Sequence, residues 1–196
     1  LFKVPVPGRM TATRKRPPIV SEKAPDFVQH VSAMMLANKG DLLPVSAFPV
    51  DGTWPVGTTK WEKRNIAVDI PVWDEFICIQ CNKCAFVCPH AAIRVKVYDH
   101  ALLAEKPITF KSVPFKGTDF KGDAYTVQVA PEDCTGCGLC VEVCPAKDKA
   151  NPRHKSLELA SQAPLRAAER DNFDFFLALP DPKRARVSLD VKGSQF

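Results

Sequence analysis

Two stretches of the chain alternate apolar and polar residues, which is the pattern of a half-buried β-strand. The first runs from Ile93 to Val97 and the second from Ala124 to Val129. Residues Arg186 to Lys192 alternate in the same way, so we expect a strand or an extended arm there, leading away from the rest of the chain. The pattern therefore predicts a small amount of β-structure in the second half of the chain.

Two further stretches place apolar residues at helical spacing. Residues 25–38 predict one amphipathic helix, with Pro25 in its first turn and Gly40 at its end. Residues 153–179 predict a C-terminal helical segment, in which Pro164 suits a helix start. The chain thus combines strands and helices without the regular alternation of a parallel α/β fold.

Apart from that first helix, residues 1–72 are rich in proline and in turn residues, and they include the basic run Arg14-Lys15-Arg16. Because proline removes backbone donors and disfavours helix, we expect an irregular connector. Trp54 and Trp61 interleave with the turns. We expect these tryptophans to pack onto the remainder of the chain or onto a neighbouring domain.

The composition is ordinary for a globular protein, with 45% hydrophobic and 25% charged residues among 196. No apolar stretch approaches the roughly 20 residues that cross a bilayer, and the first residues show no signal-peptide pattern. The net charge of +5 gives little support for nucleic-acid binding. We therefore expect a cytoplasmic protein with neither a membrane nor a nucleic acid as partner.

The most informative feature is a pair of cysteine runs, Cys78-Ile-Gln-Cys81-Asn-Lys-Cys84-Ala-Phe-Val-Cys88-Pro89 and Cys134-Thr-Gly-Cys137-Gly-Leu-Cys140-Val-Glu-Val-Cys144-Pro145. Both read C-x2-C-x2-C-x3-C-P, and all eight cysteines of the chain belong to them. This spacing resembles the ligand pattern of bacterial ferredoxins with two [4Fe–4S] clusters, in which the fourth cysteine of each run ligates the other cluster. The expected ligand sets are Cys78, Cys81, Cys84 and Cys144 for cluster 1, and Cys134, Cys137, Cys140 and Cys88 for cluster 2.

Three other uses of the cysteines compete with this interpretation. Disulfides are disfavoured because eight thiols in two short runs cannot all reach bridge geometry easily. Structural zinc sites usually present two separated C-x2-C pairs rather than three evenly spaced cysteines and a fourth before proline. Inert buried thiols would make the repetition a coincidence.

The two cysteine runs make the chain an internal repeat, although an imperfect one. A strand follows Pro89, whereas polar, turn-like residues follow Pro145, so the matching strand of the second half is expected to be missing or displaced. Residues 98–123 between the runs predict an exposed, hairpin-like insertion. Its lysines recur every five residues and serve either to dock a partner or to keep the loop soluble; they are Lys106, Lys111, Lys116 and Lys121.

The predicted fold class is α+β, a two-cluster bacterial-ferredoxin-like domain with a pseudo-twofold repeat. We expect a connector over 1–72, the two-cluster domain over 73–155, and a helical segment over 156–196. Apolar neighbours of the cysteines are expected to shield the clusters; they are Ile77, Ile79, Phe86, Val87, Leu139, Val141 and Val143. No dinucleotide or P-loop motif is present, and His90 and His154 are isolated histidines that we expect to be structural or exposed rather than catalytic, so no catalytic residue is assigned.

The stretches Trp73–Arg94 and Pro131–Lys155 resemble pyruvate:ferredoxin (flavodoxin) oxidoreductases, as do Asp51-Gly-Thr-Trp-Pro55 and Val191–Phe196. The resemblance covers the whole chain. It implies a large homodimer that oxidatively decarboxylates pyruvate on thiamine diphosphate, forms acetyl-CoA, and passes electrons through three [4Fe–4S] clusters to ferredoxin or flavodoxin. This chain, which begins at Leu1, would be the piece that holds the two outer clusters, with thiamine diphosphate, CoA and the third cluster bound elsewhere in the parent.

Two alternatives remain at this point, a free-standing two-cluster carrier and a zinc-bound structural module. Under the leading interpretation, the basic residues after the second run form a docking face for an acidic electron carrier; they are Lys147, Lys149, Arg153 and Lys155.

Overall fold

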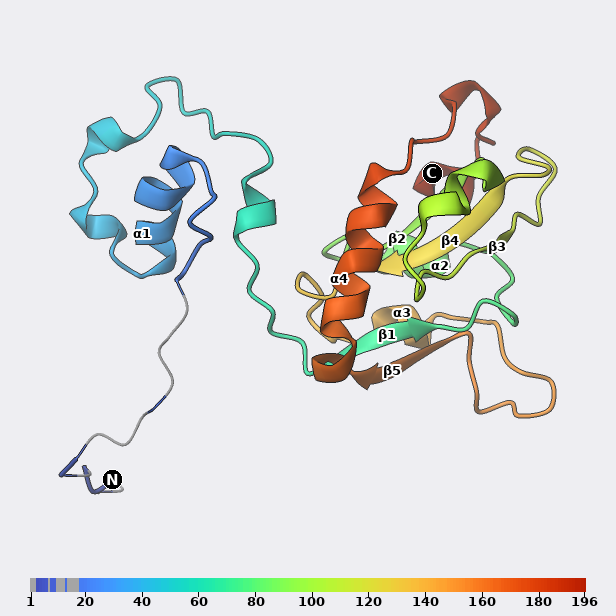
Figure 1. The fold of residues 1–196 in the computed structure, drawn as a ribbon, viewed down its shortest axis with the longest axis horizontal. Helices are drawn as coiled ribbons and strands as arrows, with labels where there is room; N and C mark the ends of the chain where they lie inside the picture. The colour runs from blue at the N-terminus through green and yellow to red at the C-terminus, as the bar shows by residue number, and fades with distance from the viewer. Residues whose placement is uncertain (1–2, 7, 10–12, 14–17) are drawn as a thin grey trace. The chain divides into compact units, whose positions relative to one another are not determined.

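The computed structural model describes residues 3–6, 8–9, 13 and 18–196. The basic run Arg14-Lys15-Arg16 lies outside the described residues. The chain divides into two compact units, one up to Lys63 and one from Arg64 to Phe196 (Figure 1). The predicted boundaries at 72/73 and 155/156 differ from this division, because elements on both sides of each of them belong to the second unit.

The first unit is built around the helix expected over residues 25–38. A π-helical segment, Val28–Ser32, continues as α1 (Ala33–Leu36), followed by short 3₁₀ turns at Gly40–Leu42, Val45–Ala47 and Thr58–Trp61. Its buried residues recur at helical spacing and are Val20, Ala24, Val28, Val31 and Ser32.

Both tryptophans of this segment pack inside the first unit. The ring centroid of Trp54 lies 4.9 Å from that of Phe27 and 6.3 Å from that of Phe48. Trp61 packs against the buried cluster that contains Val20 and Val28. In the described structure the tryptophans therefore contact residues of their own unit, but Trp54 remains 41% exposed, and packing onto a neighbouring domain stays a prediction.

The second unit contains two antiparallel sheets. Strands β2 (Ile93–Tyr98), β4 (Ala124–Val129) and β3 (Val113–Pro114) form one sheet in the order β2-β4-β3. Strands β1 (Asp69–Trp73) and β5 (Leu157–Ser161) form the other. The two strands predicted from alternation are confirmed as β2 and β4, and they pair with Val95 opposite Val127.

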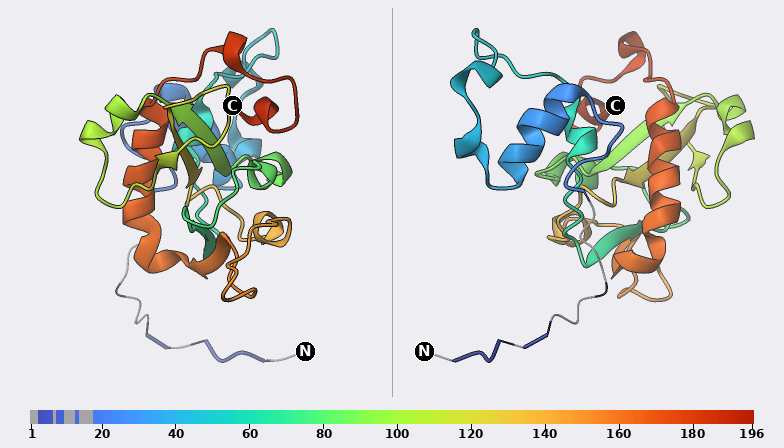
Figure 2. Two further views of the ribbon diagram at one scale, coloured as in Figure 1. Left: turned by 90° about the vertical axis from the view of Figure 1, so that its right-hand side faces the viewer. Right: turned by 60° about the vertical axis from the view of Figure 1, so that its left-hand side comes forward.

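Helices lie on both sides of the β2–β4 ladder (Figure 2). The short helices α2 (Lys83–Val87) and α3 (Leu139–Glu142), which carry cysteines, pack against each other on one side. The longer helix α4 (Gln162–Ala178) packs on the other side, against β4. Of the helices in the part of the chain that the structure describes, none is long and apolar enough to cross a membrane.

Strand alternation sends side chains to these two sides and so creates two cores. One core contains Val95, Val97, Tyr125 and Val127, packed with Trp73, Leu157 and the cysteines of α2 and α3. The opposite core contains Tyr98 and Ala124, packed with Phe173, Phe176 and Leu179 of the α4 region. The ladder therefore separates the cysteine side from the helix side.

Lys96, a buried cation of β2, fastens α4 to the ladder. Its Nζ donates hydrogen bonds to the carbonyls of Phe176 (3.2 Å) and Leu179 (2.6 Å) and pairs with Asp181 at 3.2 Å. The last carbonyls of a helix carry partial negative charge and lack partners within the helix, so a cation there is stabilising. The end of α4 thus supplies the hydrogen-bond acceptors for Lys96, a polar residue in the alternating pattern of β2.

The structure corrects two predictions for the C-terminal part of the chain. The helix expected over 153–179 is wrong for residues 157–161, which form β5 and pair with β1, with Trp73 opposite Leu157. The strand that follows the second cysteine run is therefore displaced along the chain rather than missing. The strand or arm expected over 186–192 is also wrong, because 3₁₀ turns flank this stretch and Phe196 packs back onto Phe115 and Phe120.

As predicted, most of the insertion is exposed, and its strand β3 pairs antiparallel with β4 in a hairpin-like arrangement, but buried aromatic side chains anchor it to the core. Three phenylalanines of the insertion are buried, and each directly precedes a lysine; they are Phe110, Phe115 and Phe120. Its lysines bind the backbone: Lys106 Nζ donates to the Phe110 carbonyl at 2.8 Å, and Lys111 Nζ donates to the Trp73 carbonyl and pairs with Glu75 at 3.1 Å. Like the lysines, these phenylalanines recur every five residues. The sequence interpretation overlooked them, and their burial decides where the insertion packs.

This packing predicts that Phe120→Ala lowers the free energy of unfolding by about 3–5 kcal/mol, because the large buried ring leaves a cavity. The matched control is Lys121→Ala, an exposed neighbour, which we expect to change stability by less than about 0.5 kcal/mol. Urea denaturation followed by circular dichroism measures both. Equal stabilities of the two variants would contradict the buried position of Phe120.

Candidate iron–sulfur site

The two cysteine runs adopt matching backbone conformations. The third residue of each run, Gln80 or Gly136, has a positive φ, +57° and +69° respectively. The fifth residue, Asn82 or Gly138, does too, at +60° and +77°. A left-handed residue at these positions turns each C-x2-C-x2-C loop around one centre, so that its three thiols face the same side.

Side chains hold the first loop in this conformation, although neither left-handed residue is glycine. Asn82 is buried; its Nδ2 donates to the Lys192 carbonyl, and its Oδ1 accepts from the Tyr125 hydroxyl, both at 2.9 Å. Gln80, with 0% of its surface exposed, donates from Nε2 to the Pro114 carbonyl at 2.9 Å. These bonds offset the strain of a positive φ in a residue with a Cβ atom.

Glycine serves the second loop for a different reason. A Cβ atom on Gly136 would lie 3.0 Å from the carbonyl oxygen of Asp69 and 3.6 Å from the Cβ of Ala67. The backbone at the start of β1 therefore passes close to the second loop, so a side chain at position 136 would require the neighbouring backbone to shift by a few tenths of an ångström.

The structure brings the eight cysteines together in two groups of four. We call the space lined by Cys78, Cys81, Cys84 and Cys144 the first pocket. Its other walls include Trp73, Tyr125, Val127 and Leu157 from the strands. Three of its cysteines come from the first run and one from the second.

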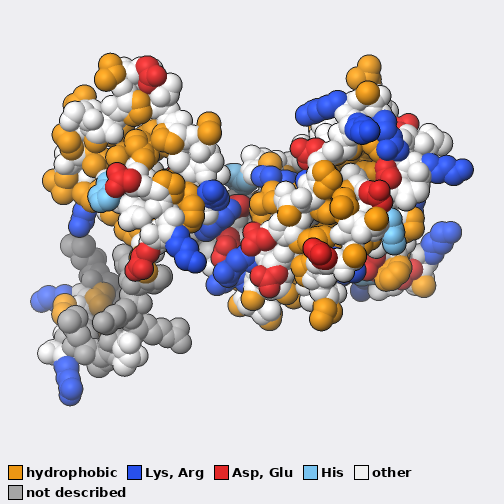
Figure 3. Space-filling model, turned by 45° about the horizontal axis from the view of Figure 1, so that its top comes forward, with side chains coloured by type: hydrophobic (Ala, Val, Ile, Leu, Met, Phe, Trp, Pro, Cys, Tyr) orange, Lys and Arg blue, Asp and Glu red, His pale blue; other side chains and the backbone are white. Residues whose placement is uncertain are grey.

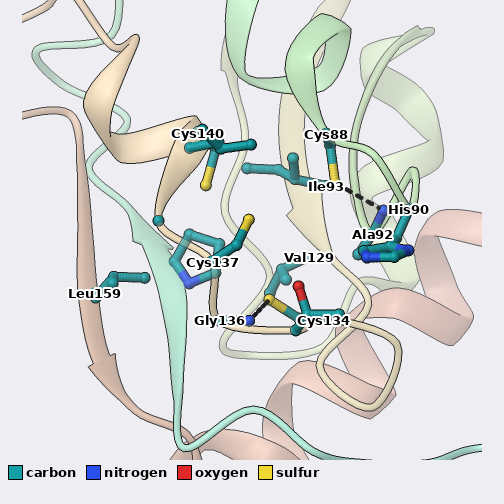
Figure 4. A pocket seen from close by; sticks show the side chains of 14 residues that line it. Cys88, His90, Ala92, Ile93, Val129, Cys134, Gly136, Cys137, Cys140 and Leu159 are labelled. Carbon is teal, nitrogen blue, oxygen red and sulfur yellow. Dashed lines mark hydrogen bonds between the residues drawn. The ribbon is translucent and has the colours of Figure 1, made fainter.

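The second pocket is lined by Cys88, Cys134, Cys137 and Cys140, three from the second run and one from the first. Figure 4 shows their sulfur atoms turned toward a common space, with Ile93, Val129 and Leu159 around it. The grouping in both pockets is the crosswise one that the spacing of the runs predicts.

Backbone amides point at three of the sulfurs. The amide of Gln80 donates to Cys78 Sγ at 3.3 Å, and the equivalent amide of Gly136 donates to Cys134 Sγ at 3.4 Å. The amide of Ala92 donates to Cys88 Sγ at 3.2 Å (Figure 4). Such N–H···S bonds stabilise thiolate ligands and the additional charge of a reduced cluster.

Burial raises the pKa of the Cys84 thiol to about 12 and that of Cys140 to about 11, with neighbouring cysteines adding to the effect. Burial likewise raises the pKa of Cys134. Thiols with such pKa values stay protonated unless a cation compensates the thiolate charge. The donor set therefore fits a metal cofactor, because metal binding supplies that charge and releases the protons.

No three His, Cys, Asp or Glu side chains of the described residues converge as ligands of one metal ion. A [4Fe–4S] core makes a different demand, because each of its four irons takes one thiolate and the sulfurs are spread around the core. A pocket walled by four separated cysteines is consistent with this requirement.

The remaining sequence-predicted residues fall into two kinds. His154 bridges Asp74 (2.8 Å) and Glu158 (3.0 Å), and hydrogen bonds to these carboxylates, first that to Asp74, raise the pKa of His154. His154 therefore ties the end of β1 to β5. His90 is exposed at the edge of the second pocket.

The predicted shielding residues are only partly buried. Ile79 lines the first pocket but is 54% exposed, and Phe86 is 58% exposed. The buried walls come instead from the strands, through Trp73, Tyr125 and Leu157. Strand alternation was the available signal for these residues, but it does not reveal which face a cofactor occupies.

On the face drawn in Figure 3, acidic and basic side chains are interspersed over the second unit. Hydrophobic side chains cover a large part of the first unit on that face. Val45 and Val50 are among the exposed hydrophobic residues of this unit.

Comparison with protein families defines the class of this domain. Residues 77–147 match the family described as a 4Fe-4S dicluster domain, and residues 13–67 match a domain of unknown function. The second unit is therefore an α+β, ferredoxin-like domain for two [4Fe–4S] clusters.

Comparison with whole proteins identifies the larger context. The chain is 52% identical to a pyruvate-flavodoxin oxidoreductase of Rhodospirillum rubrum over its whole length, and 57% identical to one of Nostoc over 87% of its length. It is 48% identical to the pyruvate:ferredoxin oxidoreductase of Moorella thermoacetica over 88% of its length. The chain spans 14–16% of the length of these relatives. The resemblance to pyruvate oxidoreductases of this kind is thereby confirmed, and the chain corresponds to one segment of these longer proteins.

The close approach over the second loop predicts that Gly136→Ala is more destabilising than Gly138→Ala. Both variants place a Cβ atom at a positive φ, which costs about 1–2 kcal/mol. At Gly138 the new atom makes only an ordinary 3.7 Å contact with Leu159, whereas at Gly136 it presses on the Asp69 carbonyl. We expect Gly136→Ala to lose about 1 kcal/mol more and to retain less iron. Equal unfolding free energies and iron contents would contradict the close approach.

Proposed function

We propose that this chain is an electron-transfer relay, within a protein that oxidatively decarboxylates pyruvate to acetyl-CoA and reduces ferredoxin or flavodoxin. The observation that carries the proposal is the crosswise grouping of the cysteines, three from one run and one from the other in each pocket. The relatives whose names state the pyruvate activity are similar to the chain over most or all of its length.

The proposed ligands of cluster 1 are Cys78, Cys81, Cys84 and Cys144, and those of cluster 2 are Cys134, Cys137, Cys140 and Cys88. Each set lines a single pocket, which supports this assignment. A bound [4Fe–4S] cluster supplies one-electron chemistry. The protein's part is to hold the thiolates, direct amides at them and exclude water with the walls formed by Trp73, Tyr125 and Leu157.

The helices of the two runs keep the two sites close together. Cys84 lies in α2 and faces the first pocket, whereas Cys88 directly follows the helix and faces the second. Four residues of helix correspond to a rise of about 6 Å. In the α3 region the order is reversed: Cys140 faces the second pocket and Cys144 faces the first. Two short stretches of backbone therefore link the two sites. This arrangement suits an electron relay.

The pseudo-twofold repeat is part of the proposal. Each cysteine run is preceded by one strand and followed by another, which pair as β2 with β4 and β1 with β5. Matching φ values in the two loops support the same relation. The symmetry is disturbed by the insertion in one half and by the longer loop before β5 in the other.

The parent protein supplies what this chain does not contain. In our proposal, residues 1–72 connect a preceding domain to the two-cluster domain at 73–155, and residues 156–196 lead toward a domain that binds thiamine diphosphate, CoA and a third cluster. The parent is proposed to be a cytoplasmic homodimer. The short coverage of the relatives supports further domains.

The first test is an anaerobic optical and EPR spectrum of the purified or reconstituted protein, with iron and sulfide measured per chain. We expect about eight irons and eight sulfides, and spin–spin coupling in the reduced state, because the two clusters are neighbours. A colourless protein with stoichiometric zinc would contradict the electron-relay proposal and support the alternative of a zinc-bound structural module.

A second prediction concerns the carrier. The loop after Cys144 exposes Lys147, Lys149 and Arg153, whereas Lys155 binds the carbonyls of Val141 (2.9 Å) and Glu142 (3.1 Å) at the end of α3. In the full-length protein, Lys147→Glu with Lys149→Glu should slow reduction of an acidic carrier about tenfold at low salt, with a weaker salt dependence.

The control for this variant is Lys121→Glu with Lys183→Glu, which changes the net charge equally at two other exposed positions of the second unit. Stopped-flow reduction of ferredoxin or flavodoxin over a range of ionic strengths measures the effect. The same rates and salt dependence in both double variants would contradict the proposal that the loop after Cys144 docks the carrier.

A further inference from the structure

The two pockets differ in what covers their loops. Residues 114–116 of the insertion cross the loop of the first run and are joined to it by three hydrogen bonds. Gln80 Nε2 donates to the Pro114 carbonyl (2.9 Å), Gln80 Oε1 accepts from the Lys116 amide (2.7 Å), and Lys116 Nζ donates to the carbonyl of Cys78. An ammonium group is thus fixed on the backbone of a cysteine of the first pocket.

The second loop has no such cover. Its third residue is Gly136, and the uncharged backbone of Ala67 and Asp69 lies over it. Neither pocket lining contains a lysine or arginine, so the difference lies in the contacts to the loops. In the part of the chain that the structure describes, Lys116 donates to the carbonyl of Cys78, whereas no lysine or arginine side chain donates to the carbonyl of a cysteine that lines the second pocket. Lys155 binds the carbonyls of Val141 and Glu142. These lie between Cys140 of the second pocket and Cys144 of the first, so the charge of Lys155 does not favour one pocket over the other.

The charge of Lys116 is not neutralised by a carboxylate. Lys111 is paired with Glu75 and Lys96 with Asp181, but among the described residues no ion pair involves Lys116. Lys116 is exposed, but its backbone is anchored, because Phe115 before it is buried and its own amide donates to the buried Gln80, and its Nζ is held by the Cys78 carbonyl. A preorganised cation keeps its orientation when the charge of a neighbouring group changes.

Reduction adds one negative charge to a [4Fe–4S] cluster, and a nearby fixed cation stabilises that charge. We propose that Lys116 raises the reduction potential of the cluster in the first pocket relative to the cluster in the second, so that a single electron resides mainly on the first. This inference rests on the ligand sets proposed above. Across a partly solvated distance, one charge changes the distribution of the electron between the clusters by about fivefold.

The test is Lys116→Gln in the full-length holoprotein, with reduction potentials measured by anaerobic EPR potentiometry. Cys81→Ser identifies the signal of the first pocket. We expect the potential of that cluster to become more negative, by an amount equivalent to about a fivefold change in electron distribution, while the second cluster is unchanged. Lys116→Arg keeps the charge and should restore the wild-type potential.

The matched control is Lys121→Gln, which removes one exposed lysine of the same insertion that makes no bond to a cysteine. Substitution of Lys116 retains its backbone amide, and with it the bond to Gln80. Unchanged potentials in Lys116→Gln, or equal shifts of both clusters, would overturn the proposal. Loss of iron from Lys116→Gln would also overturn it by showing a structural role. A wild-type protein without eight irons would instead contradict the proposed relay.

Discussion

The structure depends on the crosswise convergence of the two cysteine runs. Each pocket takes three cysteines from one run and the fourth from the other, although more than forty residues separate Cys88 from Cys134. The α2–α3 contact and the pairing of β2 with β4 and of β1 with β5 bring the runs together. Neither half of the domain completes a pocket alone, so in the proposed ligand sets a bound cluster would join the two halves and become part of the tertiary structure.

The β2–β4 ladder makes this convergence possible by separating two environments. One face presents Val95, Tyr125 and Val127 to the cysteines, and the other presents Lys96 and Ala124 to α4. Apolar walls on the first face limit water around the sites, which strengthens every nearby charge and dipole. Lys96 on the second face is satisfied by the end of the helix, so a strand with a buried lysine is stable.

The insertion between the runs connects fold and electrostatics. Its phenylalanines fill the core beside Tyr125, and this burial fixes the segment that places Lys116 over the first loop. The two halves of the repeat thereby acquire different surroundings, polar and positively charged over the first loop and plain backbone over the second. An asymmetry of this kind gives a two-cluster relay a preferred place for its electron.

The sequence alone determined the cofactor class, the eight candidate ligands, the strands β2 and β4 and the similarity to a large oxidoreductase, because cysteine spacing and strand alternation are local patterns. Only the tertiary structure decided that 157–161 form a strand, since β5 exists by pairing with β1. It also decided that the three phenylalanines of the insertion are buried and that Trp73 and Tyr125 wall the first pocket. Those features depend on contacts between residues far apart in the chain, which no local pattern encodes.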